Sequence, residues 1–206
     1  MALSQAKENI LKKIRQALSH PVPLPFPQSE GAQSVFHPAS DDLAVTFAEN
    51  FTRLQGRFAF CADEQDLRSQ LFGLVRSQNW KHIYFRDPEI AELLGTKSYS
   101  DLATCDVSIT FCECLVARTG TIVLSAALAG GRTTSVYAPV HICIASAAQV
   151  FFDLKDALQF LKEKYGADLP SQISFATGPS RTADIEKTLV TGVHGPKEVY
   201  CFLREG

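Results

Sequence analysis

From residue 41 onward, segments with helical apolar spacing alternate with short apolar segments typical of strands, and only a few fold classes have this order of elements. Helices are expected at 41–54, 64–77, 88–94, 153–164 and 181–190. Strands are expected at 57–61, 82–85, 107–111, 114–117, 121–125, 135–137, 141–145, 172–176 and 198–203. Such alternation is typical of a mainly parallel sheet covered by helices. Between 107 and 145 the strand candidates follow one another rapidly, with turn signals at Thr119-Gly120 and Gly130-Gly131, which indicates a hairpin-rich insert.

Composition and net charge limit the classes of protein to which this chain can belong. A chain of 206 residues with 46% hydrophobic residues can bury one large core without disulfides or metal. Its net charge of −2 disfavours a general nucleic-acid binder, because no global positive field is available to hold a polyanion. No apolar run reaches the ~18 residues of a membrane span, and no secretory signal is apparent, so the cytoplasm is the expected compartment.

The N-terminal segment has a different pattern. Residues 3–19 have the spacing of an amphipathic helix, and every second residue from Pro21 to Pro27 is proline, which forces an extended path. We therefore expect a helix and linker over 1–39 and an α/β domain over 40–206. The helix could pack on a distant surface or on another subunit. The prolines could form a stiff spacer or a polyproline recognition motif.

Cysteine spacing does not indicate a metal centre. None of the six cysteines forms a C-x-x-C pair, so no metal site is predicted. Cys112 and Cys114 are separated by one residue, which on a strand puts both side chains on one face. They are either a redox or metal pair or two small buried hydrophobic residues.

The segment from Ile173 to Glu186 is the most informative for function. An apolar strand leads into a Gly178-Pro179 turn, and Ser180 stands where the N-cap of a following helix is expected. Helix N-termini at the carboxyl edge of an α/β sheet bind anions. Thr177, Ser180 and Thr182 would add hydroxyl donors, and Arg181 a guanidinium. In the alternative, Ser180 only caps the helix, Asp184 complements its dipole and Arg181 is solvated.

Two histidines are candidates for proton transfer. His194 lies between glycines, in Gly192-Val193-His194-Gly195, which would present its imidazole at a surface. The same segment could also be an ordinary helix stop and loop. His141 opens an apolar strand, where a hydrogen-bonded structural histidine is the alternative.

Two further charged residues complete the candidates. Arg132 follows two glycines, which would let a ligand approach closely. Glu113, between the two cysteines, could be a nucleophile or base, although an exposed strand position is the simpler account. The predicted anion-binding residues are Thr119, Gly120, Arg132, Thr177, Gly178, Ser180, Arg181, Thr182, Asp184 and Gly195, with His194 and His141 as the catalytic candidates.

These motifs resemble a known family. The runs Thr177–Glu186 and Leu189–Pro196 resemble the C-terminal signature of the LUD domain, the lactate utilisation protein C family. Thr119-Gly120-Thr121, Arg132 and Pro139-Val140-His141 resemble its middle motifs in the same order, and the resemblance covers about residues 40–205. One departure is Arg118, which stands where the family often has glutamate, so no acidic role is assigned there.

The resemblance implies a three-layer α/β/α fold similar to that of the sugar-phosphate isomerase and CoA-transferase superfamily, with an N-terminal helical extension. It also implies a role in oxidising L-lactate to pyruvate within a multi-protein iron–sulfur system. The iron–sulfur clusters would belong to partner subunits, and this chain would bind no cofactor. It would instead bind a small carboxylate or phosphorylated anion. Two alternatives are a CoA or sugar-phosphate transferase or isomerase with Glu113 as nucleophile, and a non-enzymatic assembly or regulatory module.

Overall fold

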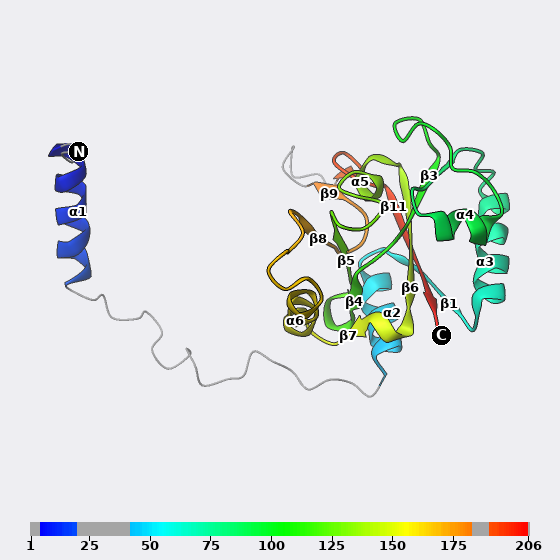
Figure 1. Cartoon of the computed structure of the whole chain (residues 1–206), viewed down its shortest axis with the longest axis horizontal. Helices are drawn as coiled ribbons and strands as arrows, with labels where there is room; N and C mark the ends of the chain where they lie inside the picture. Colours follow the sequence, from blue (N-terminus) through cyan, green and yellow to red (C-terminus); the bar gives the residue numbers. More distant parts are fainter. Residues whose placement is uncertain (1–4, 20–41, 183–189, 206) are drawn as a thin grey trace. The chain divides into compact units, whose positions relative to one another are not determined.

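The computed structural model describes residues 5–19, 42–182 and 190–205. The chain divides into two compact units, Met1–Pro38 and Ala39–Gly206. In the first unit, α1 (Gln5–Leu18) confirms the predicted N-terminal helix (Figure 1). Ile10, Ile14 and Leu18 are exposed, and their four-residue spacing puts them along one stripe of this helix. In the part of the chain described, no helix has the length and apolar character needed to cross a membrane.

The second unit is built on a five-stranded sheet. Its strand order is β1 (Arg57–Cys61), β11 (Glu198–Arg204), β6 (Val140–Ser146), β3 (Val107–Phe111) and β2 (Ile83–Tyr84). All neighbouring strands are parallel, which confirms the predicted mainly parallel sheet of an α/β fold. The last strand of the chain, β11, lies inside the sheet between β1 and β6.

A second, four-stranded sheet takes only two of its strands from the hairpin-rich segment at 107–145, because β3 and β6 of that segment belong to the parallel sheet. Its order is β7 (Val150–Phe151), β4 (Cys114–Val116), β5 (Thr121–Ser125) and β8 (Ile173–Ala176). The pairs β4–β5 and β5–β8 are antiparallel, and β7 is parallel to β4. The segment at 172–176, which follows a helix in the alternating pattern, therefore joins this second sheet and not the parallel sheet.

Four helices of this unit match the predicted ones within a few residues. They are α2 (Leu43–Arg53), α3 (Glu64–Ser77), α4 (Pro88–Leu94) and α6 (Leu154–Tyr165). Each follows an aspartate whose carboxylate accepts a hydrogen bond from a backbone N–H of the first turn, which satisfies a donor that the helix itself leaves unpaired. These N-caps are Asp42, Asp63, Asp87 and Asp153.

Apolar clusters hold the layers together, and the three largest lie between the sheets and the helices whose arrangement Figure 1 shows. On one face of the parallel sheet, α3 and α4 bury residues such as Leu71 and Ile90 against Ile142. On the other face, α2 and the second sheet enclose a cluster that includes Phe47. The far side of the second sheet packs on α6, where Leu161 is buried. Fully burying one such side chain contributes about 1.5–3 kcal/mol.

Two predicted elements are wrong. Residues 135–137 were expected as a strand but belong to the short helix α5 (Thr134–Tyr137), which begins after a turn closed by a hydrogen bond from Thr134 Oγ1 to the carbonyl of Gly130. The helix expected at 181–190 begins and ends as strand, because β9 (Arg181–Thr182) pairs antiparallel with β10 (Val190–Thr191). Residues 183–189 lie outside the described part of the chain.

Candidate functional site

A cavity of about 260 Å³ brings together residues that are far apart in the sequence. It lies between the turn at 177–180, the loop at 194–196, α5 and the first residues of β6 and β11. Six predicted site residues line it: His141, Thr177, Gly178, Ser180, His194 and Gly195. Ser135 and Ser174 add hydroxyl groups that the sequence pattern did not indicate.

The position of this cavity corrects the expected geometry. His141 and Val199, which line it, are the second residues of the parallel strands β6 and β11, so the cavity lies at the amino-terminal edge of the parallel sheet. The expected site was at the carboxyl edge, below a helix starting at Ser180. Since Arg181 and Thr182 form β9, the expected helix does not begin at Ser180, and the described residues of this turn present no helix N-terminus to an anion.

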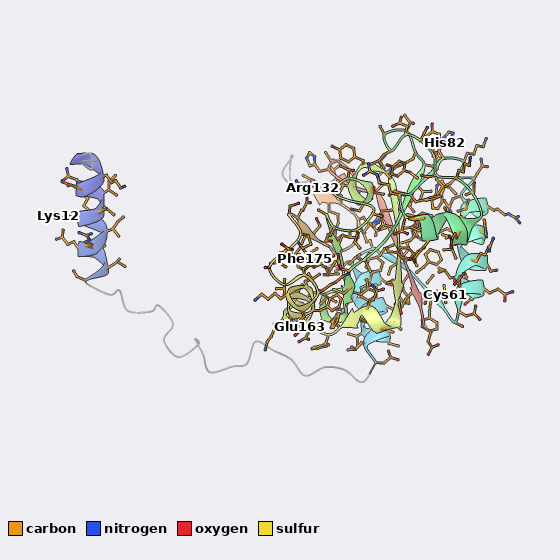
Figure 2. The ribbon with its side chains drawn as sticks, viewed as in Figure 1. Lys12, Cys61, His82, Arg132, Glu163 and Phe175 are labelled. Atoms are coloured by element: carbon orange, nitrogen blue, oxygen red, sulfur yellow. The ribbon has the colours of Figure 1, made fainter. Side chains whose placement is uncertain are left out.

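The other predicted site residues lie outside this cavity lining. Arg132 donates a hydrogen bond from Nη2 to Ser171 Oγ at 2.6 Å, on the side of the molecule near β8 (Figure 2). Arg181 and Thr182 form the two-residue strand β9, and Arg181 is exposed there. Asp184 lies outside the described residues. Within the described lining, therefore, no arginine side chain reaches the cavity.

His141 is the most buried polar residue of the cavity. It is 1% exposed, and its Nε2 lies 2.9 Å from Thr110 Oγ1 on the neighbouring strand. Burial lowers the pKa of His141 to about 4, so the imidazole is neutral at neutral pH. A neutral imidazole can share a hydrogen bond or accept a proton, but it supplies no positive charge to hold an anion.

Thr119 reaches the cavity indirectly, through hydroxyl groups. Thr119 Oγ1 lies 2.7 Å from Thr121 Oγ1, which lies 2.8 Å from Thr177 Oγ1. Thr177 in turn lines the cavity. This chain of hydroxyls was not predicted, although Thr121 belongs to the same Thr-Gly-Thr motif as Thr119.

Two of the predicted glycines, each in a different turn, allow close packing against α2. Gly120 has φ +60°, and a Cβ there would lie 2.5 Å from the backbone N of Phe51 in α2. Gly178 has φ +81°, and a Cβ there would lie 2.5 Å from the carbonyl oxygen of Leu54, at the end of α2. Both glycines therefore let the chain lie directly against α2.

Backbone hydrogen bonds join the two loops that carry the signature residues. The N–H of Ser180 donates to the carbonyl of Pro196 at 2.9 Å, and the N–H of Gly192 donates to the carbonyl of Ser180 at 2.9 Å. These bonds tie Ser180 to the returning chain instead of to a helical turn. They also hold the exposed His194 beside the turn at 177–180.

Glu113 was expected at an exposed strand position, and this is wrong. Glu113 is 1% exposed and accepts hydrogen bonds from Ser125 Oγ, from Lys164 Nζ at 2.7 Å and from Tyr165 OH at 2.6 Å. Burial alone raises the pKa of a carboxyl, but the three donors, led by Lys164, outweigh it and lower the pKa of Glu113 below its ordinary value. With its oxygens enclosed in this way, Glu113 offers no face for attack on a substrate.

The two neighbouring cysteines do not share a face. Cys112 packs in the cluster that contains Phe47, whereas Cys114 packs against α6 with Leu161. Both are buried, as expected of small hydrophobic residues. The described residues contain no group of three or more His, Cys, Asp or Glu side chains that could hold a metal ion.

Arg118, the departure from the family pattern, forms an ion pair. Its Nε lies 2.7 Å from Asp153 Oδ2, and Asp153 is the N-cap of α6. The backbone N–H of Arg118 also donates to the carbonyl of Phe152 at 3.0 Å. The positive charge at this position thus connects the segment before Gly120 to the start of α6.

The fold and the cavity define an α/β protein with a small hydroxyl- and imidazole-lined cavity between its two sheets. The LUD domain model matches residues 79–203, more than half of the chain, and the chain belongs to the LUD domain family. This confirms the resemblance drawn from the C-terminal and middle motifs.

Curated relatives carry a common name. "Lactate utilization protein C" of Bacillus velezensis is 36% identical over 146 residues, which are 68% of this chain and 61% of that protein. The protein of the same name in Bacillus subtilis is 35% identical over 114 residues, 54% of this chain and 48% of that protein. The chain therefore spans less than two thirds of the length of these relatives.

A solved structure is similar in fold. It is that of a DUF162 family protein from Deinococcus radiodurans, with a TM-score of 0.61 and 17% sequence identity, covering 81% of this chain and 99% of that one. At this identity the likeness concerns the fold alone.

Proposed function

We propose that this chain acts in lactate utilisation by binding a small hydroxy acid, or the keto acid made from it, in the cavity between the 177–180 turn and His141. The names of the family relatives support the metabolic role. The observation that carries the choice of site is the convergence of His141, His194 and the signature turn on one small cavity.

The cavity chemistry suits an oxygen-rich small molecule. Ser135, Ser174, Thr177 and Ser180 supply hydroxyls that can donate to or accept from ligand oxygens. The neutral imidazole of His141, oriented by Thr110, is able to accept the proton of a substrate hydroxyl. His194, at the exposed end, is the second group that could bind or transfer a proton there.

The positive charge that pairs with the carboxylate of the bound acid would come from Arg181. This residue follows Ser180 directly, is exposed, and makes no side-chain hydrogen bond or ion pair with another described residue. A guanidinium binds a carboxylate through two parallel hydrogen bonds. In this proposal, Arg181 closes over the ligand from β9, while Arg132 remains engaged with Ser171.

Electron transfer would require a partner. The sequence has no nicotinamide or flavin fingerprint, and its cysteines lack cluster spacing, so the proposal places the iron–sulfur centres on partner subunits. The chain's own part is then to bind and orient the substrate and to accept the proton of its hydroxyl at a histidine, while the Cα proton and the two electrons released in forming the keto acid would pass to the partner's redox centre.

A second candidate role is assembly through α1. Its exposed Ile10, Ile14 and Leu18 form an apolar stripe on a helix with basic residues on its other faces, and such a stripe is typical of a helix that docks on a partner. The transferase alternative loses its nucleophile, because Glu113 is enclosed.

Isothermal titration of the full chain with L-lactate and with pyruvate tests the proposed site. We expect binding that Ser180→Ala and Arg181→Ala each weaken, the latter by about 1.5 to 3 kcal/mol, the range for hydrogen bonds to a charged group. Arg76→Ala, an exposed arginine of α3, is the matched control. Equal weakening by the control, or no binding of either acid, would reject this site. The proposed assembly is tested by purifying the chain from its native host, identifying the proteins that co-purify with it and measuring their iron content.

A further inference from the structure

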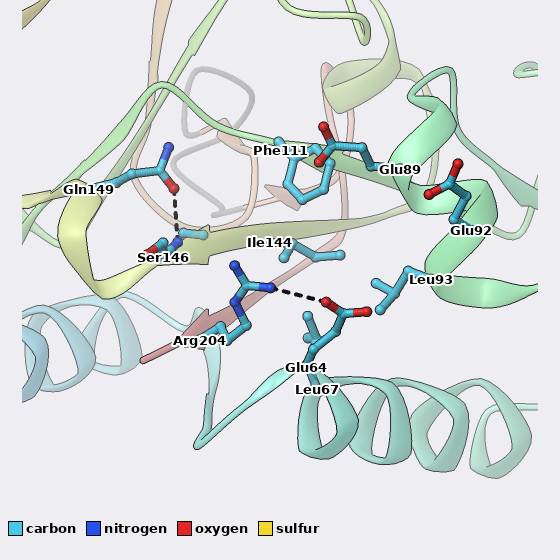
Figure 3. A pocket seen from close by; sticks show the side chains of 11 residues that line it. Glu64, Leu67, Glu89, Glu92, Leu93, Phe111, Ile144, Ser146, Gln149 and Arg204 are labelled. Atoms are coloured by element: carbon cyan, nitrogen blue, oxygen red, sulfur yellow. Dashed lines mark hydrogen bonds and ion pairs between the residues drawn. The ribbon is translucent and has the colours of Figure 1, made fainter. Parts of the chain in front are cut away.

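A second cavity, of about 610 Å³, lies at the opposite edge of the parallel sheet (Figure 3). Its lining includes Phe111, the last residue of β3, the end of β6 at 144–146, and Arg204, the last residue of β11. This is the carboxyl edge, where open α/β sheets commonly bind ligands. The residues of the family signature do not reach it.

The floor of this cavity is apolar. Phe111 and Ile144 come from the sheet, and Leu67 of α3 and Leu93 of α4 form the walls. In Figure 3 these side chains surround one opening between the strand ends and the two helices. A floor of this kind binds the apolar body of a ligand.

The rim carries three carboxylates and one guanidinium. Glu64 lies 3.6 Å from Arg204, at Oε2 and Nη1. Glu89 and Glu92, three positions apart on α4, share one helix face, and Figure 3 shows both carboxylates extending from α4 at the rim, that of Glu89 beside the ring of Phe111. Neither side chain makes a hydrogen bond or ion pair with any residue the structure describes.

This charge pattern selects among ligand classes. With three acidic and one basic side chain at the rim, a phosphate or carboxylate ligand would be repelled. A bare metal ion is also disfavoured, because the described acidic residues form no cluster that could hold one. A cationic head group would instead pair with the two free carboxylates of α4 and contact the face of Phe111.

We infer that this cavity binds a small organic cation, an ammonium or guanidinium group carried on an apolar body. The head group lies between Glu89 and Glu92, and the apolar body packs on Phe111, Ile144 and Leu93. This site is separate from the His141 cavity, since His141 is the second residue of β6 and Ile144 lies towards the end of that strand. The inference therefore does not depend on the proposed role in lactate utilisation, and either can fail without the other.

Titration of the ¹⁵N-labelled full chain tests the inference with three probes that share a phenethyl body and differ in head-group charge: phenethylammonium, 2-phenylethanol and 3-phenylpropionate. We expect phenethylammonium to shift the amides of Phe111, Ile144 and Arg204, and to bind about tenfold more tightly than the neutral alcohol, with the anion weakest. The amides of Ser180 and His194 should not move.

Two double variants give the matched comparison. Glu89→Gln with Glu92→Gln should remove the preference for the cation while leaving the weak binding of the alcohol. Glu163→Gln with Asp168→Asn removes the same charge at α6 and just after it, and should leave the preference intact. Absence of shifts up to about 10 mM phenethylammonium, preference for the anion, or equal effects of the two double variants would each overturn the inference.

Discussion

The imidazole Nε2 of His141 lies 2.9 Å from Thr110 Oγ1, in a bond that joins β6 to β3 beneath the candidate cavity. Strand register pairs Ser108, not Thr110, with His141, so the bond runs diagonally across the two strands. It holds a titratable ring inside the protein at a point where protonation would leave a buried charge.

Acid should therefore destabilise the fold through His141. Burial lowers its pKa from 6.5 in the unfolded chain to about 4, so between these values the unfolded state binds a proton that the folded state does not. The contribution is full above pH 6.5 and is lost as pH falls. From pH 7 to 4.5, the free energy of unfolding should decrease by about 2 to 3 kcal/mol on this account.

Urea unfolding of the full chain and of His141→Gln at both pH values measures this effect. The variant should be less stable at pH 7 and should lose less stability on acidification. His194→Gln, at an exposed position, is the control and should behave as the parent. Parallel pH curves for the parent and His141→Gln would contradict the prediction.

Glu113→Gln should destabilise the fold by about 1 to 3 kcal/mol, because it removes the charge that Lys164, Tyr165 and Ser125 share in a buried position. The pKa of Glu113 is lowered, so its contribution is present above the ordinary carboxyl pKa and is lost as pH falls through the folded value. Glu163→Gln on the same helix as Lys164 should change stability by less than about 0.5 kcal/mol. Calorimetric unfolding compares the stabilities of the two variants. Equal effects would show that the hydrogen bonds of Glu113 to Lys164, Tyr165 and Ser125 do not stabilise the fold.

Gly120→Ala should cost about 2 to 4 kcal/mol, because φ is +60° and the new Cβ would meet the Phe51 backbone at 2.5 Å. Gly73→Ala is the opposite control. Gly73 lies within α3, where a Cβ has no atom within 4 Å, so this change should raise stability by about 0.5 to 1 kcal/mol. Denaturant midpoints of both variants provide the measurement. A neutral Gly120→Ala would contradict the direct packing of Gly120 on α2.

Arg118→Met should lower stability by about 0.5 to 1 kcal/mol, since the side chain is partly exposed and the change removes its ion pair with Asp153. Hydrogen exchange should rise in the first turn of α6, because Asp153 caps that helix. Arg76→Met, at an exposed position of α3, should leave exchange in α6 unchanged. Unchanged protection in α6 after Arg118→Met would argue against the coupling.

The described cysteines should resist alkylation in the native state. All six are buried and free, and burial raises the pKa of Cys61 to about 11 and is the first of the causes that raise the pKa of Cys114 to about 12. Iodoacetamide at pH 8, followed by mass spectrometry, should therefore modify them only as fast as the chain unfolds. Rapid modification of Cys112 and Cys114 in the folded protein would revive the redox interpretation.

The local pattern of apolar residues was enough to determine most elements. Helix α3 and strands β1, β3 and β5 begin and end where the sequence predicts, because 3.6-residue and 2-residue periodicities are set by neighbours in the chain. The family motifs were likewise readable as contiguous residues, and the family model confirms the family that they indicate.

Only the tertiary structure decided the environment of Glu113 and of Ser180. A glutamate is ordinarily exposed, but Glu113 lies in the bend between β3 and β4, where Lys164 and Tyr165, more than fifty positions away, make its burial favourable. A serine followed by acidic residues is typical of an N-cap, but its N–H bonds instead to Pro196, in a chain that returns beside it as strand. Such partners are chosen by packing between distant segments, and no local periodicity encodes which segments meet.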